Sequence, residues 1–396
     1  MITARRTRLH RAPTLPAFRA ALVALVPVDS IDRARETFVL VPTRSAGQLL
    51  RRTIEDLALR PGAAIVMPDV LTRRDWYERL HQRTPGLPRL LTPFEREVLV
   101  EAAAHEAVTE GDTPPFNIRP ALLAEILDLY DGLRGHQQTL ARFEEQLTAT
   151  FSAAADYDRG AERLLRQTRF LVRTLQGYEQ RVATLGQLDE HHLRDALLET
   201  ASLTPYRAAV VAVGDQAQDP NGLPAADFDL LTRLPGLEAI DFVATEEQLA
   251  AGLYDRLHDL LPGLEDAKVP PPEAKLEAPV LLVPEQEPRA GSFLSRDRED
   301  ELSDLVRRIR AVHSQRRSEE GLSRSEAGLK SCSTGVSALD RVGVVVGRPL
   351  PYVYLARGVF ASGGVPLQSR DALPLAAEPF AAALDLIFSA VSTGFA

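Results

Sequence analysis

The chain has 396 residues, of which 45% are hydrophobic and 26% charged, and its formal net charge is −9. This composition is that of a soluble globular protein and excludes a fibrous or wholly disordered one, and the length predicts two or three domains. The apolar runs fall far short of the roughly 20 residues that a membrane span requires, and no apolar stretch follows the basic start, so neither membrane insertion nor secretion is expected.

The numbers of cysteine and of basic residues indicate the cellular compartment and the kind of ligand that the protein could bind. The single cysteine, Cys332, cannot form an internal disulfide, which favours a reducing compartment, and we expect a cytoplasmic protein. The 46 Lys+Arg residues include only a handful of lysines. Guanidinium groups make forked contacts suited to phosphate, although a GC-rich genome produces the same bias. The negative net charge argues against a protein that coats DNA with its whole surface, but it permits a local basic channel.

Five short apolar runs predict strands that are buried on both faces, because most are continuous rather than alternating. They lie at residues 38–41, 64–67, 208–213, 280–283 and 342–346. Amphipathic helical patterns lie between them, for example over residues 120–134 and 297–312. Strands that alternate with helices predict an α/β fold with parallel sheets.

The patterns also predict a domain organisation. Residues 1–270 are expected to form a first α/β domain with a helical insertion at about 93–200, where no strand pattern occurs. The proline-rich residues 271–279 predict a stiff linker. A second α/β domain is expected over 280–396, truncated because the chain stops directly after an apolar stretch, and the polar segment 314–335 is expected to be a flexible surface loop.

Three segments together resemble one known family. Residues 39–52, VLVPTRSAGQLLRR, are similar to the strand and helix that follow the phosphate loop in UvrD-like helicases and their AddB relatives. Residues 212–237 resemble the central strand of the same motor domain with its following helix, and residues 341–386, which contain a G-V-P tripeptide, resemble the second motor domain. By the order and spacing of these segments, the chain resembles the N-terminal, helicase-like part of an AddB-type subunit of the AddAB helicase–nuclease.

This resemblance implies a fold of UvrD-like, RecA-like helicase domains and a role in the repair of DNA double-strand breaks. It implies an AddA-like helicase subunit and single-stranded or end DNA as partners. The complete proteins of that family also carry an iron–sulfur-associated PD-(D/E)XK nuclease domain, to which no segment here corresponds. The iron–sulfur cluster and the magnesium would belong to that domain, so this chain is expected to hold no cofactor and not to be an enzyme by itself.

The nucleotide-hydrolysis residues are missing from the places where the resemblance puts them. An ATPase motor needs a glycine-rich turn with a lysine and a Ser/Thr to hold the phosphates. Residues 9–20 read LHRAPTLPAFRA there, with neither glycine nor lysine, and leave only Arg11 and Thr14 to reach a phosphate. Instead of an Asp-Glu pair, a later strand is followed by Asp215, with Gln218 near the place of a nucleotide-sensing glutamine. These four positions predict a degenerate nucleotide site.

Two patterns mimic metal sites and are rejected. The sequence DEHH at 189–192 follows polar residues rather than a strand, and Asp189 is better interpreted as a helix N-cap followed by histidines that project about 100° apart. The PD at 68–69 and the EAK at 273–275 mimic a nuclease pattern, but they lie far apart in the sequence and the second falls in the linker. No metal site is expected.

Arginine and aromatic residues suited to single-stranded DNA follow two of the expected strands. They are Thr43 and Arg44 after one strand, and Thr72, Arg73, Arg74 and Trp76 after the next. Ligands gather at the carboxyl ends of parallel strands, so both clusters are expected to open on one edge of the sheet. The alternative is that Trp76 packs its helix on the core and the arginines are solvated, because tryptophans are usually mostly buried.

Two functions follow from these expectations. The first is a catalytically inert helicase-like module that contacts single-stranded DNA and docks a motor subunit. The second is a purely structural scaffold without DNA binding. A salt-dependent affinity for single strands distinguishes the first from the second. An active ATPase or nuclease is disfavoured by the missing residues.

Overall fold

The computed structural model describes residues 5–58, 64–154, 157–199, 206–217, 219, 221–269, 295–326, 339, 342–346, 349–369 and 379–392. The chain divides into two compact units, one formed by Met1–Lys275 with Ala383–Ala396 and the other by Leu276–Ala382. Among the described residues, no helix is long and apolar enough to cross a membrane.

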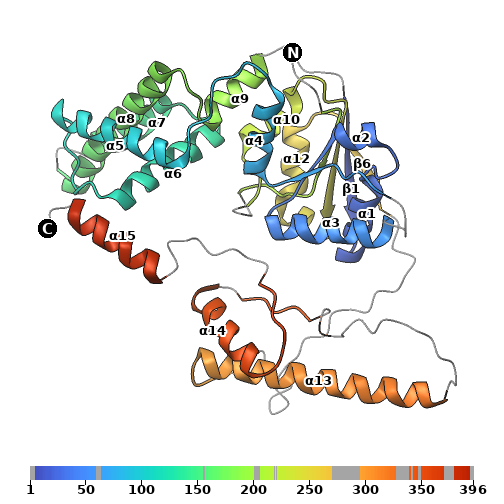
Figure 1. The fold of residues 1–396 in the computed structure, drawn as a ribbon. Helices are drawn as coiled ribbons and strands as arrows, with labels where there is room; N and C mark the ends of the chain where they lie inside the picture. Colours follow the sequence, from blue (N-terminus) through green and yellow to red (C-terminus); the bar gives the residue numbers. More distant parts are fainter. Residues whose placement is uncertain are drawn as a thin grey trace. The chain divides into compact units, whose positions relative to one another are not determined.

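An all-parallel sheet lies among helices in the α/β part of the first unit (Figure 1). In the described residues it has six strands in the order β3-β2-β4-β5-β1-β6. The strands are β1 (Arg6–Ala12), β2 (Thr37–Leu40), β3 (Asp69–Leu71), β4 (Ala208–Val211), β5 (Ala239–Thr245) and β6 (Glu265–Lys268). The connections from β1 to β3 run toward one edge and the later connections run toward the other. Because such crossovers are right-handed, this reversal places helices on both faces, and the fold is a doubly wound α/β fold.

The two faces have separate apolar cores. Side chains alternate between the faces along each strand, so Val39 packs with α1 (Leu15–Leu25) and α3 (Arg44–Ala58), whereas Phe38 packs on the opposite side. Besides the π-helix η2 (Leu249–Leu253), four α-helices contribute described residues to the core on the Phe38 side. They are α4 (Arg73–Arg83), α9 (Glu190–Glu199), α10 (Ala225–Arg233) and α12 (Tyr254–Leu260).

Two of the five predicted strands are confirmed. The runs at 38–41 and 208–213 contain β2 and β4, which are almost completely buried. The run at 64–67 is not a strand: the strand begins at Asp69, directly after Pro68, which has no amide to donate to a ladder. The run at 342–346 is not a strand either, and three of its valines are exposed. The run at 280–283 lies outside the described residues.

Strands β1 and β5 were missed because polar residues interrupt their apolar pattern. Arg8 and His10 on β1 both contact Asp241 on β5, with distances of 2.6 Å from Arg8 Nε and 2.9 Å from His10 Nε2 to Asp241 Oδ1. Asp241 is buried, and burial opposes its ionisation, but these two partners outweigh burial and lower its pKa. A charge that would be costly alone is therefore neutralised across the sheet.

A helical bundle is inserted between β3 and β4 and has its own apolar core. It contains α5 (Pro93–Thr109), α6 (Pro120–Gly135), α7 (Leu140–Phe151), the 3-10 helix η1 (Ser152–Ala154) and α8 (Arg159–Leu185). The helix predicted over 120–134 is confirmed as α6. Helices α5 and α8 approach closely at Gly177, where an added Cβ would lie 3.3 Å from the Ala103 side chain. Helix α9 follows the bundle and leads back to the sheet.

The remaining elements of the first unit are short. They are α2 (Ile31–Arg35), α11 (Glu246–Gln248) and the π-helix η2 (Leu249–Leu253).

The regular elements among the described residues of the second unit are helices. Helix α13 (Arg298–Glu326) packs its buried Leu302, Val306 and Ile309 against α14 (Pro349–Ser362). The helix predicted over 297–312 is thus confirmed, but it continues to Glu326, so the loop predicted over 314–335 is wrong up to that residue. Helix α15 (Pro379–Ser392) follows in the chain, and from Ala383 onward it is assigned to the first unit. The sheet expected over 280–396 is not found among the described residues.

Candidate nucleic-acid interface

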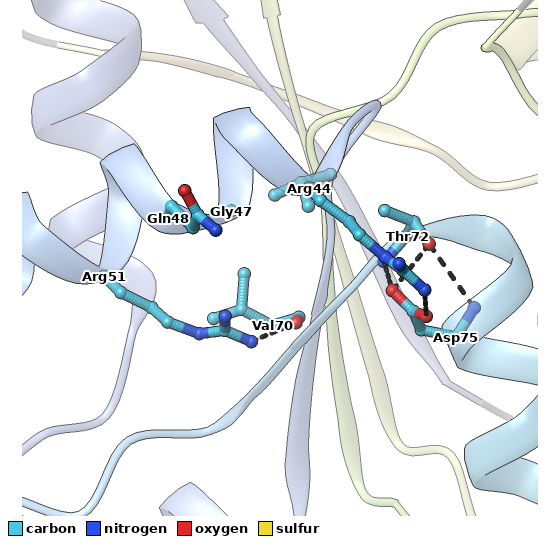
Figure 2. A pocket seen from close by; sticks show the side chains of 8 residues that line it. Arg44, Gly47, Gln48, Arg51, Val70, Thr72 and Asp75 are labelled. Atoms are coloured by element: carbon cyan, nitrogen blue, oxygen red, sulfur yellow. Dashed lines mark hydrogen bonds and ion pairs between the residues drawn. The ribbon is translucent and has the colours of Figure 1, made fainter. Parts of the chain in front are cut away.

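A polar cavity of about 140 Å³ opens where β2 and β3 end and α3 and α4 begin (Figure 2). It is lined by Val41, Arg44, Gly47, Gln48, Arg51, Val70, Thr72 and Asp75. The cavity brings residues that follow β2 together with residues that follow β3, two segments that are also neighbours in the sheet. We call this cavity and the adjoining first turns of α3 and α4 the Arg44 edge.

Capping hydroxyl groups set the directions of the two helices. Thr43 Oγ1 accepts a hydrogen bond of 3.1 Å from the amide of Ala46, near the start of α3. Thr72 caps α4 in the same way and exchanges hydrogen bonds with Asp75, which forms a capping box. Both threonines are therefore used to begin helices, and their roles at this edge are positional.

A glycine allows α3 to lie close to the strand ends. A Cβ at Gly47 would lie 3.3 Å from Val41 Cγ2 and 3.4 Å from Val70 Cγ1, which is tighter than usual contact. The glycine keeps the first turn of α3 near the floor of the cavity. The amides of that first turn carry the positive end of the helix dipole.

Two arginines and one carboxylate set the charge of the cavity. The side chain of Arg44 is 76% exposed, and its Nη2 lies 3.0 Å from Asp75 Oδ1. Arg51 Nη2 donates a hydrogen bond of 2.7 Å to the carbonyl of Val70 (Figure 2). Burial opposes ionisation of Asp75, but hydrogen bonds from Thr72 and Arg44 outweigh it and lower the pKa of Asp75. Asp75 is thus an ionised competitor for any anion that approaches Arg44.

Arg73 points away from this cavity, into the protein. It pairs with Asp227 on α10 and Glu190 on α9, and Tyr77 donates a hydrogen bond of 2.6 Å to Asp227. The Asp227 side chain is completely buried, and burial raises its pKa despite the charge of Arg73. Arg73 therefore neutralises a buried acid, and its guanidinium group, which was expected to contact DNA, is occupied by two carboxylates.

Trp76 is also internal, with an exposed fraction of 0%. Its indole stacks on Phe38 with ring centroids 5.7 Å apart and an interplanar angle of 22°. It cannot stack on a DNA base in this conformation. Of the two interpretations left open by the sequence, the structure shows the packed one, and the proposed base-stacking role of Trp76 is corrected.

Arg74 lies on the outer face of α4. Its side chain is 67% exposed and contacts Glu78, one turn along the helix, at 3.2 Å. Such exposed pairs within a helix are weak and readily exchanged for another anion. Arg44 and Arg74 are thus the two predicted DNA-contacting arginines that reach the surface.

The positions predicted to form a degenerate nucleotide site are engaged in helix capping and ion pairs. Only Pro13 and Thr14 separate β1 from α1, and Thr14 caps that helix through a hydrogen bond of 3.3 Å from Ala17 N. Arg11 Nη2 lies 2.8 Å from Glu246 Oε2, and its Nη1 lies 3.2 Å from Asp266 Oδ2. These hydrogen bonds raise the pKa of Arg11, first through Glu246 and then through Asp266. The guanidinium group is already bound to two carboxylates.

Asp215 belongs to a tight turn. It is buried and lies 2.9 Å from Arg256 Nε, and its Oδ1 accepts a hydrogen bond of 3.2 Å from Ala217 N. A Cβ at Gly222 would lie 2.3 Å from the carbonyl carbon of Asp215, so the turn requires glycine there. These contacts give Asp215 a structural role, and Gln218 lies outside the described residues.

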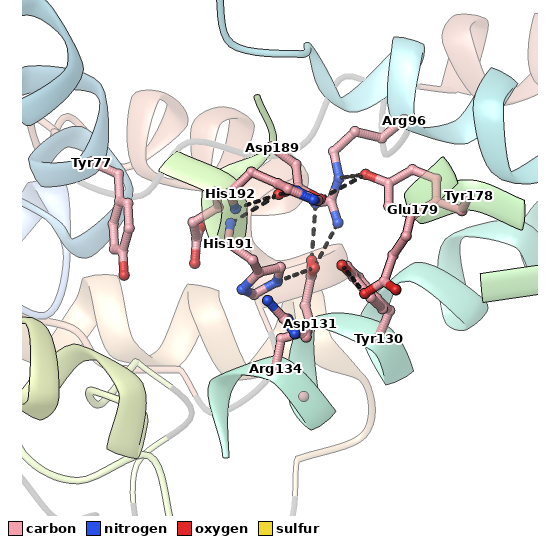
Figure 3. A network of polar contacts seen from close by, with 12 residues as sticks. Tyr77, Arg96, Tyr130, Asp131, Arg134, Tyr178, Glu179, Asp189, His191 and His192 are labelled. Carbon is pink, nitrogen blue, oxygen red and sulfur yellow. Dashed lines mark hydrogen bonds and ion pairs between the residues drawn. The ribbon is translucent and has the colours of Figure 1, made fainter. Parts of the chain in front are cut away.

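A buried polar network joins the bundle to α9 (Figure 3). Asp189 is confirmed as the N-cap of α9, because its Oδ1 accepts hydrogen bonds from the amides of His191 and His192. The two histidines face different partners: His191 Nε2 lies 2.8 Å from Asp131 Oδ1, and His192 Nδ1 lies 2.7 Å from Asp189 Oδ1. Arg96 pairs with Asp131 at 2.6 Å. Local sequence patterns indicated the cap but not the partners in this network, because Arg96, Asp131 and the histidines come from α5, α6 and α9.

The nuclease-like pattern does not assemble in the described part of the chain. Asp69 accepts hydrogen bonds of 2.5 Å from Tyr206 and 3.1 Å from Arg79, and residues 273–275 lie outside that part. Among the described residues, no three acidic, histidine or cysteine side chains form a group that would hold a metal.

Comparison with known proteins found no protein-family model and no curated protein that matches the chain. The candidate functions are therefore compared through the contacts at two sites that follow strands of the sheet, the Arg11 site and the Arg44 edge. One site has its arginine bound to two carboxylates, and the other presents arginines to solvent beside a cavity.

Proposed function

We propose that the chain is a non-catalytic, helicase-like module of a DNA double-strand-break repair helicase–nuclease, which contacts single-stranded DNA at the Arg44 edge and docks an AddA-like motor subunit. The observation that carries this proposal is the pair of contrasting strand-end sites. Where a motor would hold its nucleotide, Arg11 is bound to Glu246 and Asp266. At the site proposed for single-stranded DNA, Arg44 and Arg74 are exposed.

The fold supports this proposal in a general way. The doubly wound parallel sheet with a helical bundle inserted between β3 and β4 has the layers that a RecA-like helicase domain requires. The two-residue connection between β1 and α1 leaves no room for a phosphate-binding loop. A helicase-like domain that has lost the loop retains its strand-end surface for DNA and its outer surface for a partner.

The chemistry of the Arg44 edge suits a sugar–phosphate backbone. Guanidinium groups on phosphates, together with helix N-termini, position a strand without reading its sequence. The ion pair between Arg44 and Asp75 is exposed and therefore weak, so a phosphate can replace the carboxylate. With Trp76 buried, binding at this edge is expected to depend on phosphate contacts more than on base stacking.

A second candidate function is the structural scaffold without DNA binding. The observation in its favour is that Arg73 and Trp76 are committed to internal packing. In that case Arg44 and Arg74 are solvated surface charges that do not contact DNA.

Oligo-dT binding by the whole chain at several salt concentrations tests the proposal. The double variant Arg44→Gln/Arg74→Gln is compared with Arg33→Gln/Arg207→Gln, which removes the same charge from exposed arginines near the opposite, amino edge of the sheet. Two lost phosphate contacts should reduce the slope of log affinity against log salt by about 1.4. An equal slope in both variants, or no oligo-dT binding by the wild type, contradicts DNA contact at this edge and favours the scaffold.

A separate measurement tests the absence of motor activity. The purified chain is expected neither to bind ATP tightly nor to hydrolyse it when oligo-dT is added. Hydrolysis that single strands stimulate and that Asp215→Ala abolishes would show that the nucleotide site is functional.

A further inference from the structure

One face of α8 carries a row of arginines far from the Arg44 edge in the sequence. The row, which we call the arginine stripe, consists of Arg159, Arg163, Arg166, Arg169 and Arg173. All five are exposed, whereas Leu165, Leu171 and Leu175 on the same helix are buried in the bundle core. At about 100° and 1.5 Å per residue, the five arginines occupy an arc of about 120° and a length of about 21 Å.

The ion pairs of the stripe leave much of its charge available. Arg173 is bound to Glu110 at 2.5 Å, and Arg166 lies 3.9 Å from Glu162. Arg163 donates a hydrogen bond of 3.2 Å to the carbonyl of Pro115, which leaves its charge uncompensated. Arg159 and Arg169 form no ion pair with the described residues. The basic part of the stripe therefore runs from Arg159 to Arg169.

The other end of the stripe is not basic. Beside Arg169 and Arg173, a groove of about 310 Å³ is also lined by Glu110, Asp112 and Glu144. Glu110 is paired with Arg173, and the other two carboxylates add negative charge at this end of the stripe. The difference in charge between the two ends limits the proposed contact surface, because a polyanion would lie along the first turns of α8 and avoid the acidic groove.

We propose that the arginine stripe is a second DNA-contacting surface, which binds the phosphate backbone of a DNA duplex. The chain as a whole has a net charge of −9, so five exposed arginines on one helical face are a local concentration of charge that complements a polyanion. Phosphates follow one another at about 3.4 Å along the axis for each strand of a duplex, so the basic part from Arg159 to Arg169, about 15 Å long, is comparable to the axial rise of roughly four of them.

The side chains beside the stripe favour a duplex over a single strand. Single strands are held by aromatic rings on which the bases stack. The aromatic residues of α8, Phe170 and Tyr178, are completely buried. Tyr157, which is 82% exposed, precedes the helix by two residues and is a ring that a single strand could use near the start of the stripe. A stiff duplex backbone needs no such rings.

The choice of DNA as the polyanion rests on the proposed function, but the basic surface does not. The stripe belongs to the inserted bundle and the Arg44 edge belongs to the sheet, so the two surfaces are removed by different substitutions. Loss of one surface need not affect the other.

Duplex binding by the whole chain tests this inference. The triple variant Arg159→Gln/Arg166→Gln/Arg169→Gln is compared with Arg33→Gln/Arg207→Gln/Arg233→Gln, which removes the same charge from exposed arginines outside α8. We expect the stripe variant to lose about tenfold or more in affinity for a blunt 20-base-pair duplex and to reduce the salt slope by about 2.7. Circular dichroism verifies that both variants are folded.

Three outcomes overturn the duplex assignment. One is a duplex affinity and salt slope that the stripe variant leaves unchanged, and another is an equal loss in both variants, which reports only total charge. The third is a loss of oligo-dT binding that Tyr157→Ala reproduces while duplex binding is unaffected, because the stripe would then hold a single strand. If duplex binding depends on the stripe but oligo-dT binding is absent, the stripe stands and the proposed role of the Arg44 edge fails.

Discussion

The two faces of α4 treat neighbouring arginines in opposite ways. On the inner face, Arg73 is paired with the buried Asp227, and Trp76 is packed against Phe38. On the outer face, Arg74 is mostly exposed and contacts only Glu78 among the described residues. Successive positions on a helix differ by about 100°, so one residue step separates an internal charge from a surface charge.

A cluster of arginine and aromatic residues can therefore stabilise the fold with some members and supply surface charge with others. The inner residues hold α4 on the sheet and on α9, and so fix the strand-end cavity. The outer residues, with Arg44, supply exposed charge beside it. Substitutions on the inner face should therefore change stability, and those on the outer face should change DNA affinity.

Trp76→Ala should have the largest effect on stability. Removing a completely buried indole leaves a cavity beside Phe38 and should lower the free energy of unfolding by about 3–5 kcal/mol. Urea unfolding measures this loss, and Phe94→Ala, which truncates an exposed ring, is the control with little change. Normal stability of Trp76→Ala together with a lost affinity for oligo-dT would return this residue to the DNA-binding surface.

Arg73→Leu should be the next most destabilising change. It leaves Asp227 buried without its charge partner, which typically costs about 3–5 kcal/mol for a well-buried pair, and the partial exposure of Arg73 places the loss toward the lower value. Arg74→Leu is the matched control on the outer face. The double variant Arg73→Leu/Asp227→Leu should recover much of the loss, because the completely buried charge of Asp227 is removed with its partner and Glu190 is partly exposed to solvent. A double variant that is no more stable than Arg73→Leu would argue against this explanation.

The network at the start of α9 should give a smaller effect that depends on pH. Burial opposes ionisation of Asp189, but His192 outweighs it and lowers the pKa of Asp189 below 3.8. The hydrogen bond to Asp189 raises the pKa of His192 above 6.5. The contribution of Asp189 is present above the unfolded pKa and is lost as pH falls, whereas that of His192 is present below 6.5 and is lost as pH rises through its folded pKa.

The variant Asp189→Asn isolates this charge, because asparagine still caps a helix. It should lower the free energy of unfolding by about 1.5–3 kcal/mol between roughly pH 4 and 6.5, where both groups are charged in either state. The loss should shrink on either side of this window. Urea unfolding at pH 3, 5.5 and 8 makes the comparison, and a loss of the same size at all three values would exclude the charged pair as the cause.

Local patterns in the sequence predicted the elements whose burial is uniform. Strands β2 and β4 have continuous apolar runs, and α6 has a single apolar stripe. Strand β1 escaped prediction because Arg8 and His10 are tolerated only through Asp241, more than two hundred residues away. A pattern of neighbours cannot report a partner so distant.

The same limit explains why only part of the candidate site could be predicted from the sequence. The meeting of the segments after β2 and β3 followed from the geometry of parallel strands, and the cavity beside Arg44 lies there. The separation of Arg73 from Arg74 depended on Asp227 and Glu190, which come from two later helices. Residue type predicted which side chains could bind phosphate, and distant partners decided which of these side chains reach the surface.

The smallest expected effect is a gain in DNA affinity at the outer face. Asp75 holds Arg44 at 3.0 Å and carries a negative charge beside the cavity. Asp75→Asn removes the carboxylate that competes with phosphate for Arg44. The affinity for oligo-dT should therefore rise about two- to fivefold at moderate salt, which matches the small free energy of an exposed ion pair. The gain should vanish in the background of Arg44→Gln, because the guanidinium group is what the substitution releases. The control Glu78→Gln alters the pair of Arg74 instead. An increase that persists without Arg44 would show that only the general loss of negative charge matters, and the Arg44 edge would not be the contact.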